Sequence, residues 1–142
     1  MRFFTPPKIN SNYAPLWRAA YFLELIVVST TIFGFVIVLF AALISLALSA
    51  HDFGNVLFLT ELFVTVALAA MGINLWIQTF LGIVKKEAVV NNGIGAISSG
   101  LPLVCGSPKE EPVRGRKAVA KGAHTFIALV ILLFVARMVS FR

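Results

Sequence analysis

Four polar side chains inside long apolar stretches are the first candidates for chemistry in this sequence. Glu24 and Glu61 each interrupt an apolar run, and Asn74 and Gln78 lie four residues apart, on one face of a helix. Carboxylates inside a membrane often mark proton or ion pathways. Two amides in hydrocarbon need hydrogen-bond partners, and they can also line a path for water or a polar ligand.

The depths of the two carboxylates argue against a proton relay. Glu24 falls near the start of the first apolar run, and Glu61 lies about one and a half turns from the opposite end of the hairpin. We therefore expect each carboxylate to have a partner at its own depth. The sequence offers Lys85 or Arg18 for Glu24, and Arg137 for Glu61.

The amide pair is also interpreted as structural. Interhelical hydrogen bonds are the ordinary use of Asn and Gln in apolar helices, at roughly 0.6 to 2 kcal/mol each. We expect Asn74 and Gln78 to make such bonds across a helix interface.

Three apolar runs must position these side chains. They are Tyr21 to Ala50, Val56 to Val84 and Ala123 to Phe141, and each contains one charged residue. Because a hydrocarbon core of about 30 Å requires about 20 helical residues, each run can cross a bilayer. Hydrophobic residues make up 59% of the chain and charged residues 13%, against roughly 25% charged in soluble domains. The sequence predicts an all-α integral membrane protein with three transmembrane helices, an antiparallel hairpin plus a third span.

The predicted organisation is a single membrane domain over residues 1–142, with spans at about 18–50, 56–85 and 120–141 and an inner loop at 86–119. The first run is about twice as long as the apolar core of a signal peptide, so we interpret it as a retained anchor. We expect residues 1–16 to be extended and the first helix to begin near Pro15 to Arg18, because proline is tolerated in a first helical turn.

Residues 88–108 form an uncharged, glycine-rich stretch within the inner loop. Its length of 21 residues would allow a fourth span, but Asn91, Asn92 and Pro102 disfavour an apolar helix. A full crossing would also move the basic residues that follow to the outer side. An interfacial, re-entrant or packed irregular loop is therefore favoured over a fourth span.

Positively charged residues predict the orientation. Arg2, Lys8 and Arg18 precede the first span, whereas the turn between spans one and two carries Asp52 and no Lys or Arg. By the positive-inside rule, the N-terminus and the 86–119 loop lie on the inner, cytoplasmic-type side and the C-terminus on the outer side. Lipid headgroups are expected to contact a set of basic residues of the loop, namely Lys85, Lys86, Arg114, Arg116, Lys117 and Lys121.

Small residues recur along two of the spans at helical spacing, which allows close approach of helices in lipid. The predicted helix-packing positions are Thr30, Gly34, Ala41 and Ser45 in the first span, and Thr65, Ala69 and Gly72 in the second. The partner of each stripe, within the chain or in another subunit, stays open.

The sequence contains no pattern typical of an enzyme. Phosphate-binding glycine motifs, a nucleophile elbow and metal-ligand spacings are missing, and Cys105 is the only cysteine. His51 and His124 fall on opposite membrane faces, so a bis-histidine haem within one chain is not expected. We expect no catalytic residue, metal or cofactor.

The expected function is that of a noncatalytic small integral-membrane subunit of a larger assembly, of respiratory, photosynthetic or secretion type. Its partners would be membrane lipids and other membrane subunits or copies of itself, with no nucleic acid, because the basic residues flank the spans. One alternative is a homo-oligomeric pore or fibre-forming subunit. A further alternative is a subunit that binds a quinone, lipid or pigment.

Overall fold

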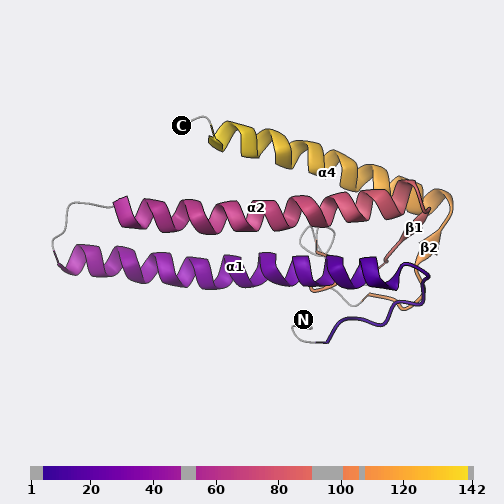
Figure 1. Cartoon of the computed structure of the whole chain (residues 1–142), viewed down its shortest axis with the longest axis horizontal. Coiled ribbons are helices and arrows are strands. Elements are labelled where there is room, and N and C mark those ends of the chain that lie inside the picture. The colour runs from indigo at the N-terminus through magenta and orange to yellow at the C-terminus, as the bar shows by residue number, and fades with distance from the viewer. Residues whose placement is uncertain (1–4, 49–53, 91–100, 106–107, 141–142) are drawn as a thin grey trace.

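The computed structural model of the chain describes residues 5–48, 54–90, 101–105 and 108–140. Three long helices dominate it, and two short strands pair next to their basic end (Figure 1). The elements are α1 (Ala14–Ala47), α2 (Gly54–Ile83), β1 (Glu87–Ala88), β2 (Val113–Arg114) and α4 (Arg116–Ser140). Their order confirms the all-helical class that the apolar runs predict.

All three helices are long and apolar enough to cross a membrane. At 1.5 Å per residue, α1, α2 and α4 are about 51, 45 and 37 Å long, against about 30 Å of hydrocarbon. α1 and α2 run antiparallel as a hairpin, and α4 packs on the other side of α2 (Figure 1). The start of α1, the end of α2 and the start of α4 therefore share one end of the molecule.

The helix boundaries follow the chain chemistry closely. α1 begins at Ala14 with Pro15 in its first turn, and residues 5–12 contain no helix, as expected. Residues 14–16 were expected to be extended but are helical, because Pro15 is tolerated in the first turn. Residues 1–4 lie outside the described part. α4 begins at Arg116, four residues before the expected span. Gly115 precedes it with a φ of 82°, a left-handed conformation that glycine adopts without strain, and its carbonyl accepts the N–H of Val119.

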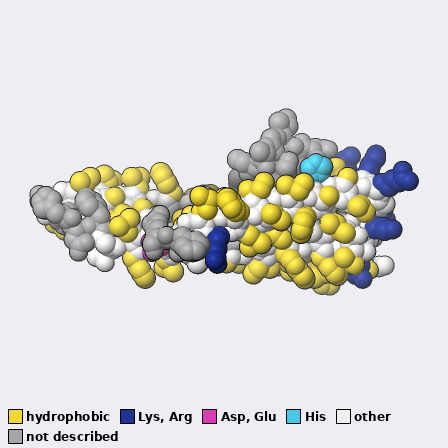
Figure 2. All heavy atoms as spheres, turned by 90° about the horizontal axis from the view of Figure 1, so that it is seen from above, with side chains coloured by type: hydrophobic (Ala, Val, Ile, Leu, Met, Phe, Trp, Pro, Cys, Tyr) yellow, Lys and Arg dark blue, Asp and Glu magenta, His cyan; other side chains and the backbone are white. Residues whose placement is uncertain are grey.

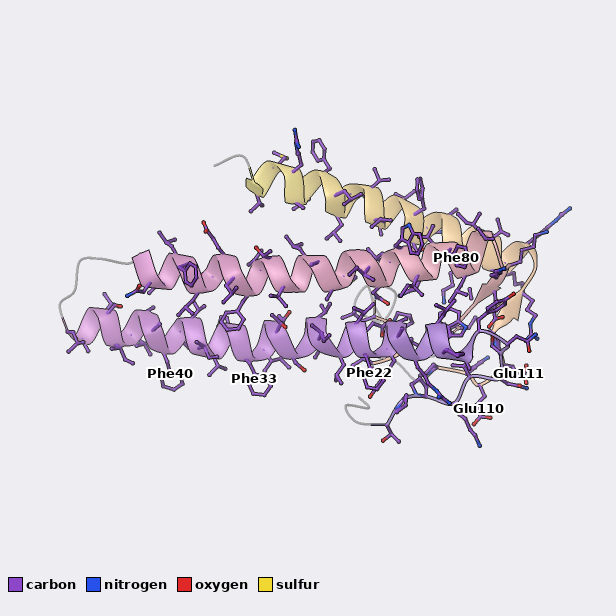
Figure 3. The ribbon with its side chains drawn as sticks, in the orientation of Figure 1. Phe22, Phe33, Phe40, Phe80, Glu110 and Glu111 are labelled. Carbon is purple, nitrogen blue, oxygen red and sulfur yellow. The ribbon has the colours of Figure 1, made fainter. Side chains whose placement is uncertain are left out.

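Most of the helix surface is apolar and exposed. Phe33, Phe35 and Phe40 on α1 are 65%, 70% and 60% exposed, and Phe33 and Phe40 point away from α2 (Figure 3). Figure 2 shows hydrophobic side chains over most of one face and Lys and Arg gathered mainly at one end. Such a distribution is typical of helices surrounded by lipid with a basic flank in water.

The inner loop is more ordered in part than the sequence predicts. β1 and β2 form an antiparallel pair in which Glu87 lies opposite Arg114, and Gly115 donates its N–H to the carbonyl of Lys86 over 3.2 Å. The expectation of an irregular inner loop is wrong for these residues, because the backbone groups of the two segments pair with each other in a short ladder.

The chain segments at this end form a cap. The N-terminal leader joins it through the N–H of Asn10, which bonds to the Glu110 carbonyl at 2.8 Å, and through the Asn10 side chain, which donates to Glu111. Glu110 and Glu111 lie beside the leader at this end (Figure 3). The described parts of 88–108 are not a span: residues 88–90 and 101–105 fold against α1 and α2, and residues 91–100 and 106–107 lie outside the described part.

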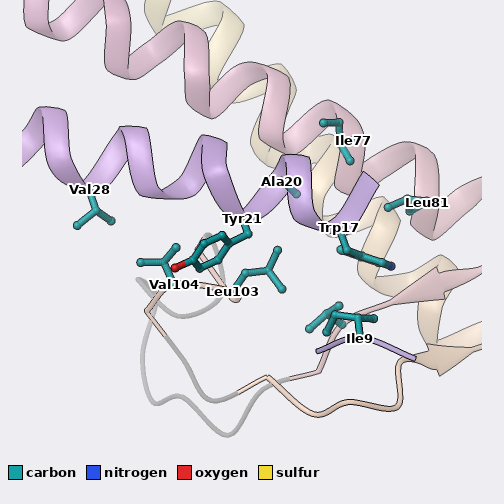
Figure 4. Close-up of a cluster of buried hydrophobic side chains, with 10 residues drawn as sticks. Ile9, Trp17, Ala20, Tyr21, Val28, Ile77, Leu81, Leu103 and Val104 are labelled. Atoms are coloured by element: carbon teal, nitrogen blue, oxygen red, sulfur yellow. The ribbon is translucent and has the colours of Figure 1, made fainter. Parts of the chain in front are cut away.

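The buried core lies in this capped half and not along the whole bundle. It combines side chains of the leader, α1, α2 and the loop (Figure 4). Its members are Ile9, Trp17, Ala20, Tyr21, Val28, Ile77, Leu81, Val89, Leu103 and Val104. The cap therefore folds as part of the helix bundle.

Two glycines let α2 and α4 touch at the basic end. A Cβ placed on Gly82 would lie 2.6 Å from the Cα of Gly122, so neither position has room for a side chain. Just beyond this crossing, the Thr79 hydroxyl donates to the Thr125 hydroxyl at 3.1 Å. From there the two helices draw apart toward the C-terminus of α4 (Figure 1).

Candidate functional site

A buried polar cluster joins α1, α2 and the inner loop at Glu24. The Glu24 carboxylate is 0% exposed. Its Oε2 accepts the backbone N–H groups of Leu103 and Val104 at 2.9 and 3.0 Å. Its Oε1 accepts Nε2 of Gln78 at 3.3 Å. Two main-chain donors and one amide thus satisfy a carboxylate in an otherwise apolar surrounding.

The local fold explains why the two N–H groups are available. Residues 101–105 make a single turn in which the N–H of Cys105 bonds to the carbonyl of Leu101 at 3.0 Å. The N–H groups of Leu103 and Val104 therefore point out of the turn together, as they do at a helix start or a backbone nest. Both side chains are fully buried beside Tyr21 (Figure 4), which fixes the turn against α1.

Asn74 and Gln78 come together on α2, as their spacing predicts. Nε2 of Gln78 donates to Oδ1 of Asn74 at 3.1 Å and to Glu24. The bond between Gln78 and Glu24 crosses from α2 to α1, so Gln78 makes the interhelical contact that the sequence predicts. Asn74 is also 0% exposed, and its Nδ2 has no hydrogen-bond partner among the described residues.

The expected ion pair of Glu24 with Lys85 or Arg18 is wrong. The donors that meet Glu24 come from the main chain and from Gln78. Nζ of Lys85 lies instead 5.3 Å from the ring centroid of Tyr13, and Arg18 is exposed. The reason is position: Glu24 lies in the third turn of α1, which the loop covers, so a packed turn reaches it in place of a surface cation.

A second buried carboxylate holds the cap to α1. Glu87 is 4% exposed and its Oε1 accepts the indole N–H of Trp17 at 2.9 Å. From α4, Nζ of Lys121 donates to the carbonyl of Val89. Sequence reasoning missed Glu87, because it stands in a basic flank where a carboxylate is normally solvated.

An apolar groove with a volume of about 970 Å³ lies between α2 and α4. It opens where the two helices draw apart (Figure 1). Trp76 of α2 lines it and is 60% exposed. The Trp76 ring stacks on the ring of Phe80, with 5.9 Å between the ring centroids. Polar atoms enter the lining at Thr60 and Glu61.

The two small-residue stripes have different surroundings. In α1, Gly34 is buried against Phe63 of α2, where a Cβ would meet the ring at 2.8 Å. In α2, Gly72 faces Leu132 of α4, where a Cβ would lie 3.8 Å from the leucine side chain, an ordinary van der Waals contact, and all three predicted positions line the groove. These three are Thr65, Ala69 and Gly72, while Thr30, Ala41 and Ser45 of α1 are half-buried.

The remaining predicted residues lie apart from the buried cluster. Glu61 lines the groove, and Arg137 is exposed in the last turn of α4; their pairing stays a prediction. The residues expected at lipid headgroups are exposed at the basic end except for half-buried Lys121, namely Lys85, Lys86, Arg114, Arg116 and Lys117.

The described residues contain no group of three or more His, Cys, Asp or Glu side chains that could hold a metal ion. His124 is exposed on α4, where its Nδ1 lies 2.7 Å from the carbonyl of Ala120, and His51 lies outside the described ranges. Burial raises the pKa of the Cys105 thiol above its ordinary value, and the charge of Glu24 raises it further. That thiol is therefore poorly suited to act as a nucleophile at neutral pH.

A scan against protein-family models found no match to this chain, and searches of curated proteins and of solved structures found none either.

Proposed function

We propose that this chain is a small noncatalytic subunit of a larger membrane assembly and that its α2/α4 groove receives a transmembrane helix of another subunit. The groove carries the proposal, because it is an apolar hollow of about 970 Å³ along helices long enough to cross a membrane. The capped end supports it by fixing α1, α2 and α4 at one side, which leaves the opposite half of the bundle open.

The groove lining favours a helix as occupant. Thr65, Ala69 and Gly72 present small side chains along α2, and small residues let helix backbones approach closely in lipid. The side chains of Thr60 and Glu61 add polar atoms to the α2 wall of the groove. Helix association in lipid depends on such packing and hydrogen bonds, since apolar burial alone supplies little.

The proposed orientation places the N-terminus and the 86–119 loop on the inner side. This follows from the gathering of Lys and Arg at the capped end (Figure 2) and the positive-inside rule. With three spans, the C-terminus then lies on the outer side.

A second candidate uses the same groove. Its volume lies within the range of about 300 to 1,000 Å³ that is typical of ligand sites, so it would also hold a quinone, a lipid chain or a pigment. The exposed ring of Trp76 would provide a stacking surface for such a ligand.

Purification from native membranes in mild detergent tests the proposal. A subunit should copurify with unlike membrane proteins in fixed ratio, and Ala69→Phe, which fills the groove, should release them. Val66→Phe is the matched control, since Val66 is exposed on α2 but does not line the groove. A monodisperse monomer without partners would contradict the proposal. A bound quinone or lipid that is lost in Ala69→Phe would favour the second candidate. A ladder of self-oligomers would favour a homo-oligomeric pore or fibre.

A further inference from the structure

The partners of Glu24 are all hydrogen-bond donors, and none of them is a cation. No Lys or Arg among the described residues forms a salt bridge with it, and the main-chain N–H groups of Leu103 and Val104 take the place of one. A carboxylate buried in this way stays charged only while those donors stay in place. The position of the 101–105 turn and the charge of Glu24 are therefore linked.

The amides of Asn74 and Gln78 can serve either charge state of Glu24. At present Gln78 donates to both Glu24 and Asn74, and Nδ2 of Asn74 has no partner among the described residues. Rotating a carboxamide by half a turn exchanges its donor and acceptor. With both amides rotated, Oε1 of Gln78 would accept two hydrogen bonds. One would come from the O–H group of protonated Glu24 and the other from Nδ2 of Asn74. The orphan donor would then be replaced by an orphan acceptor, which is easier to bury.

We propose that Glu24, Asn74 and Gln78 form a proton-binding site, and that protonation of Glu24 loosens the 101–105 turn from α1. Hydrogen bonds from N–H groups to an ionised carboxylate are roughly twice as strong as those to a neutral acceptor. Proton uptake therefore weakens both main-chain bonds at once, while the rotated amides satisfy the new O–H group. This inference rests on the buried cluster and does not depend on the groove or on the proposed subunit role.

The groups around the site identify Glu24 as the group that titrates. α1 contributes the Tyr21 side chain, α2 the two uncharged amides, and the turn contributes Cys105, whose raised pKa keeps it a neutral thiol near pH 7. The cationic group that approaches from α4 is Lys121, which lines a cavity of about 10 Å³ together with Gln78. That volume is close to the smallest that holds one water.

Amide hydrogen exchange on the full-length chain in lipid nanodiscs tests the link directly. The exchange of residues 101–105 would be followed by mass spectrometry over a pH series and corrected for the chemical exchange rate at each pH. We expect protection at alkaline pH and at least a tenfold loss on acidification, about 1.4 kcal/mol. Glu24→Gln, which mimics the protonated acid, should exchange at the fast rate at every pH. Glu61→Gln is the matched control and should keep the wild-type response.

Infrared difference spectra on the same samples detect the protonation of Glu24 directly. Acidification should produce the C=O stretching band of a protonated carboxylic acid in wild type, with the same midpoint as the loss of protection, and Glu24→Gln should lack that band. The wild-type titration needs no variant, so it stands even if a substitution unfolds the chain. Protection that stays constant through the pH range in which the band appears would overturn the proposal. So would a Glu24→Gln protein that is protected as strongly as wild type at alkaline pH.

Discussion

Replacing Gly82 by alanine should destabilise the α2/α4 crossing, although alanine is the better helix former. A Cβ at position 82 would lie 2.6 Å from the Cα of Gly122 and 3.0 Å from the carbonyl oxygen of Ala118. Both are main-chain atoms, which cannot move away as the end of a flexible side chain can. The helices must therefore separate or shift along each other.

Gly72 provides the matched comparison for the magnitude. It lies in the same helix, and a Cβ there meets only the end of the Leu132 side chain at 3.8 Å, an ordinary contact. Both Gly→Ala changes gain about 1 kcal/mol of helix propensity, so this contribution cancels between them. Overpacking costs about 1 to 3 kcal/mol, and we expect Gly82→Ala to be less stable than Gly72→Ala by that amount. At 1.4 kcal/mol per factor of ten, a middle value of about 2 kcal/mol is about 30-fold in the unfolding equilibrium.

Reversible unfolding in mixed micelles, followed by helical circular dichroism, measures this difference. Gly122→Ala should behave like Gly82→Ala, since its Cβ would lie 3.0 Å from the Gly82 backbone. Equal stability of Gly82→Ala and Gly72→Ala would refute the close crossing of α2 and α4.

Three further outcomes are expected. Trp17→Phe removes the donor to the buried Glu87 carboxylate, so it should lower the free energy of unfolding by about 1 to 3 kcal/mol, and a double-mutant cycle with Glu87→Gln should show the coupling. Alkylation of native Cys105 should be slower at neutral pH than that of an unfolded cysteine, and its rate should rise with pH with a midpoint above the ordinary thiol pKa. Glu24→Gln should lower that midpoint, because it removes the charge beside the thiol. An unchanged midpoint would contradict the effect of Glu24 on Cys105. In a Cys105→Ser background, Lys117→Cys should resist a membrane-impermeant maleimide in intact cells and Asp52→Cys should react, whereas the reverse pattern would invert the orientation.

The helices could be predicted from the sequence because their signal is local. Run length and hydropathy identify three spans, and Pro15 fixes the start of the first to within two residues. The positions of Lys and Arg in the sequence predict that most of them lie at one end of the helices, and the structure places them there (Figure 2). The antiparallel hairpin follows from the six-residue connection between α1 and α2, which lies mostly outside the described residues.

The buried cluster could be predicted only in part. The spacing of Asn74 and Gln78 indicates a shared face, and both do lie together with Glu24. The sequence did not predict the other donors to Glu24, which are the backbone N–H groups of Leu103 and Val104. Every residue except proline has a backbone N–H, so residue types do not indicate which of them bind a carboxylate. A more general clue was the apolar Leu101–Val104 stretch in a polar loop, which has to be buried somewhere.

The groove depends on a tertiary feature that no local pattern encodes. The stripe at Thr65, Ala69 and Gly72 predicts helix contact, but the divergence of α4 from α2 leaves part of it uncovered. Gly82 and Gly122 bring the helices together at one end, and their meeting depends on the angle at which α4 leaves the cap.

Site-specific photo-crosslinking in native membranes tests the proposed docking surface most directly. A photoreactive amino acid would replace Thr65, which lines the groove, or its neighbour Val66, which is exposed at the same depth outside the groove. We predict a discrete crosslink to another membrane protein from position 65, little from position 66, and loss of the crosslink in Ala69→Phe. Equal crosslinking from both positions, or a crosslink from position 65 that survives Ala69→Phe, would contradict it.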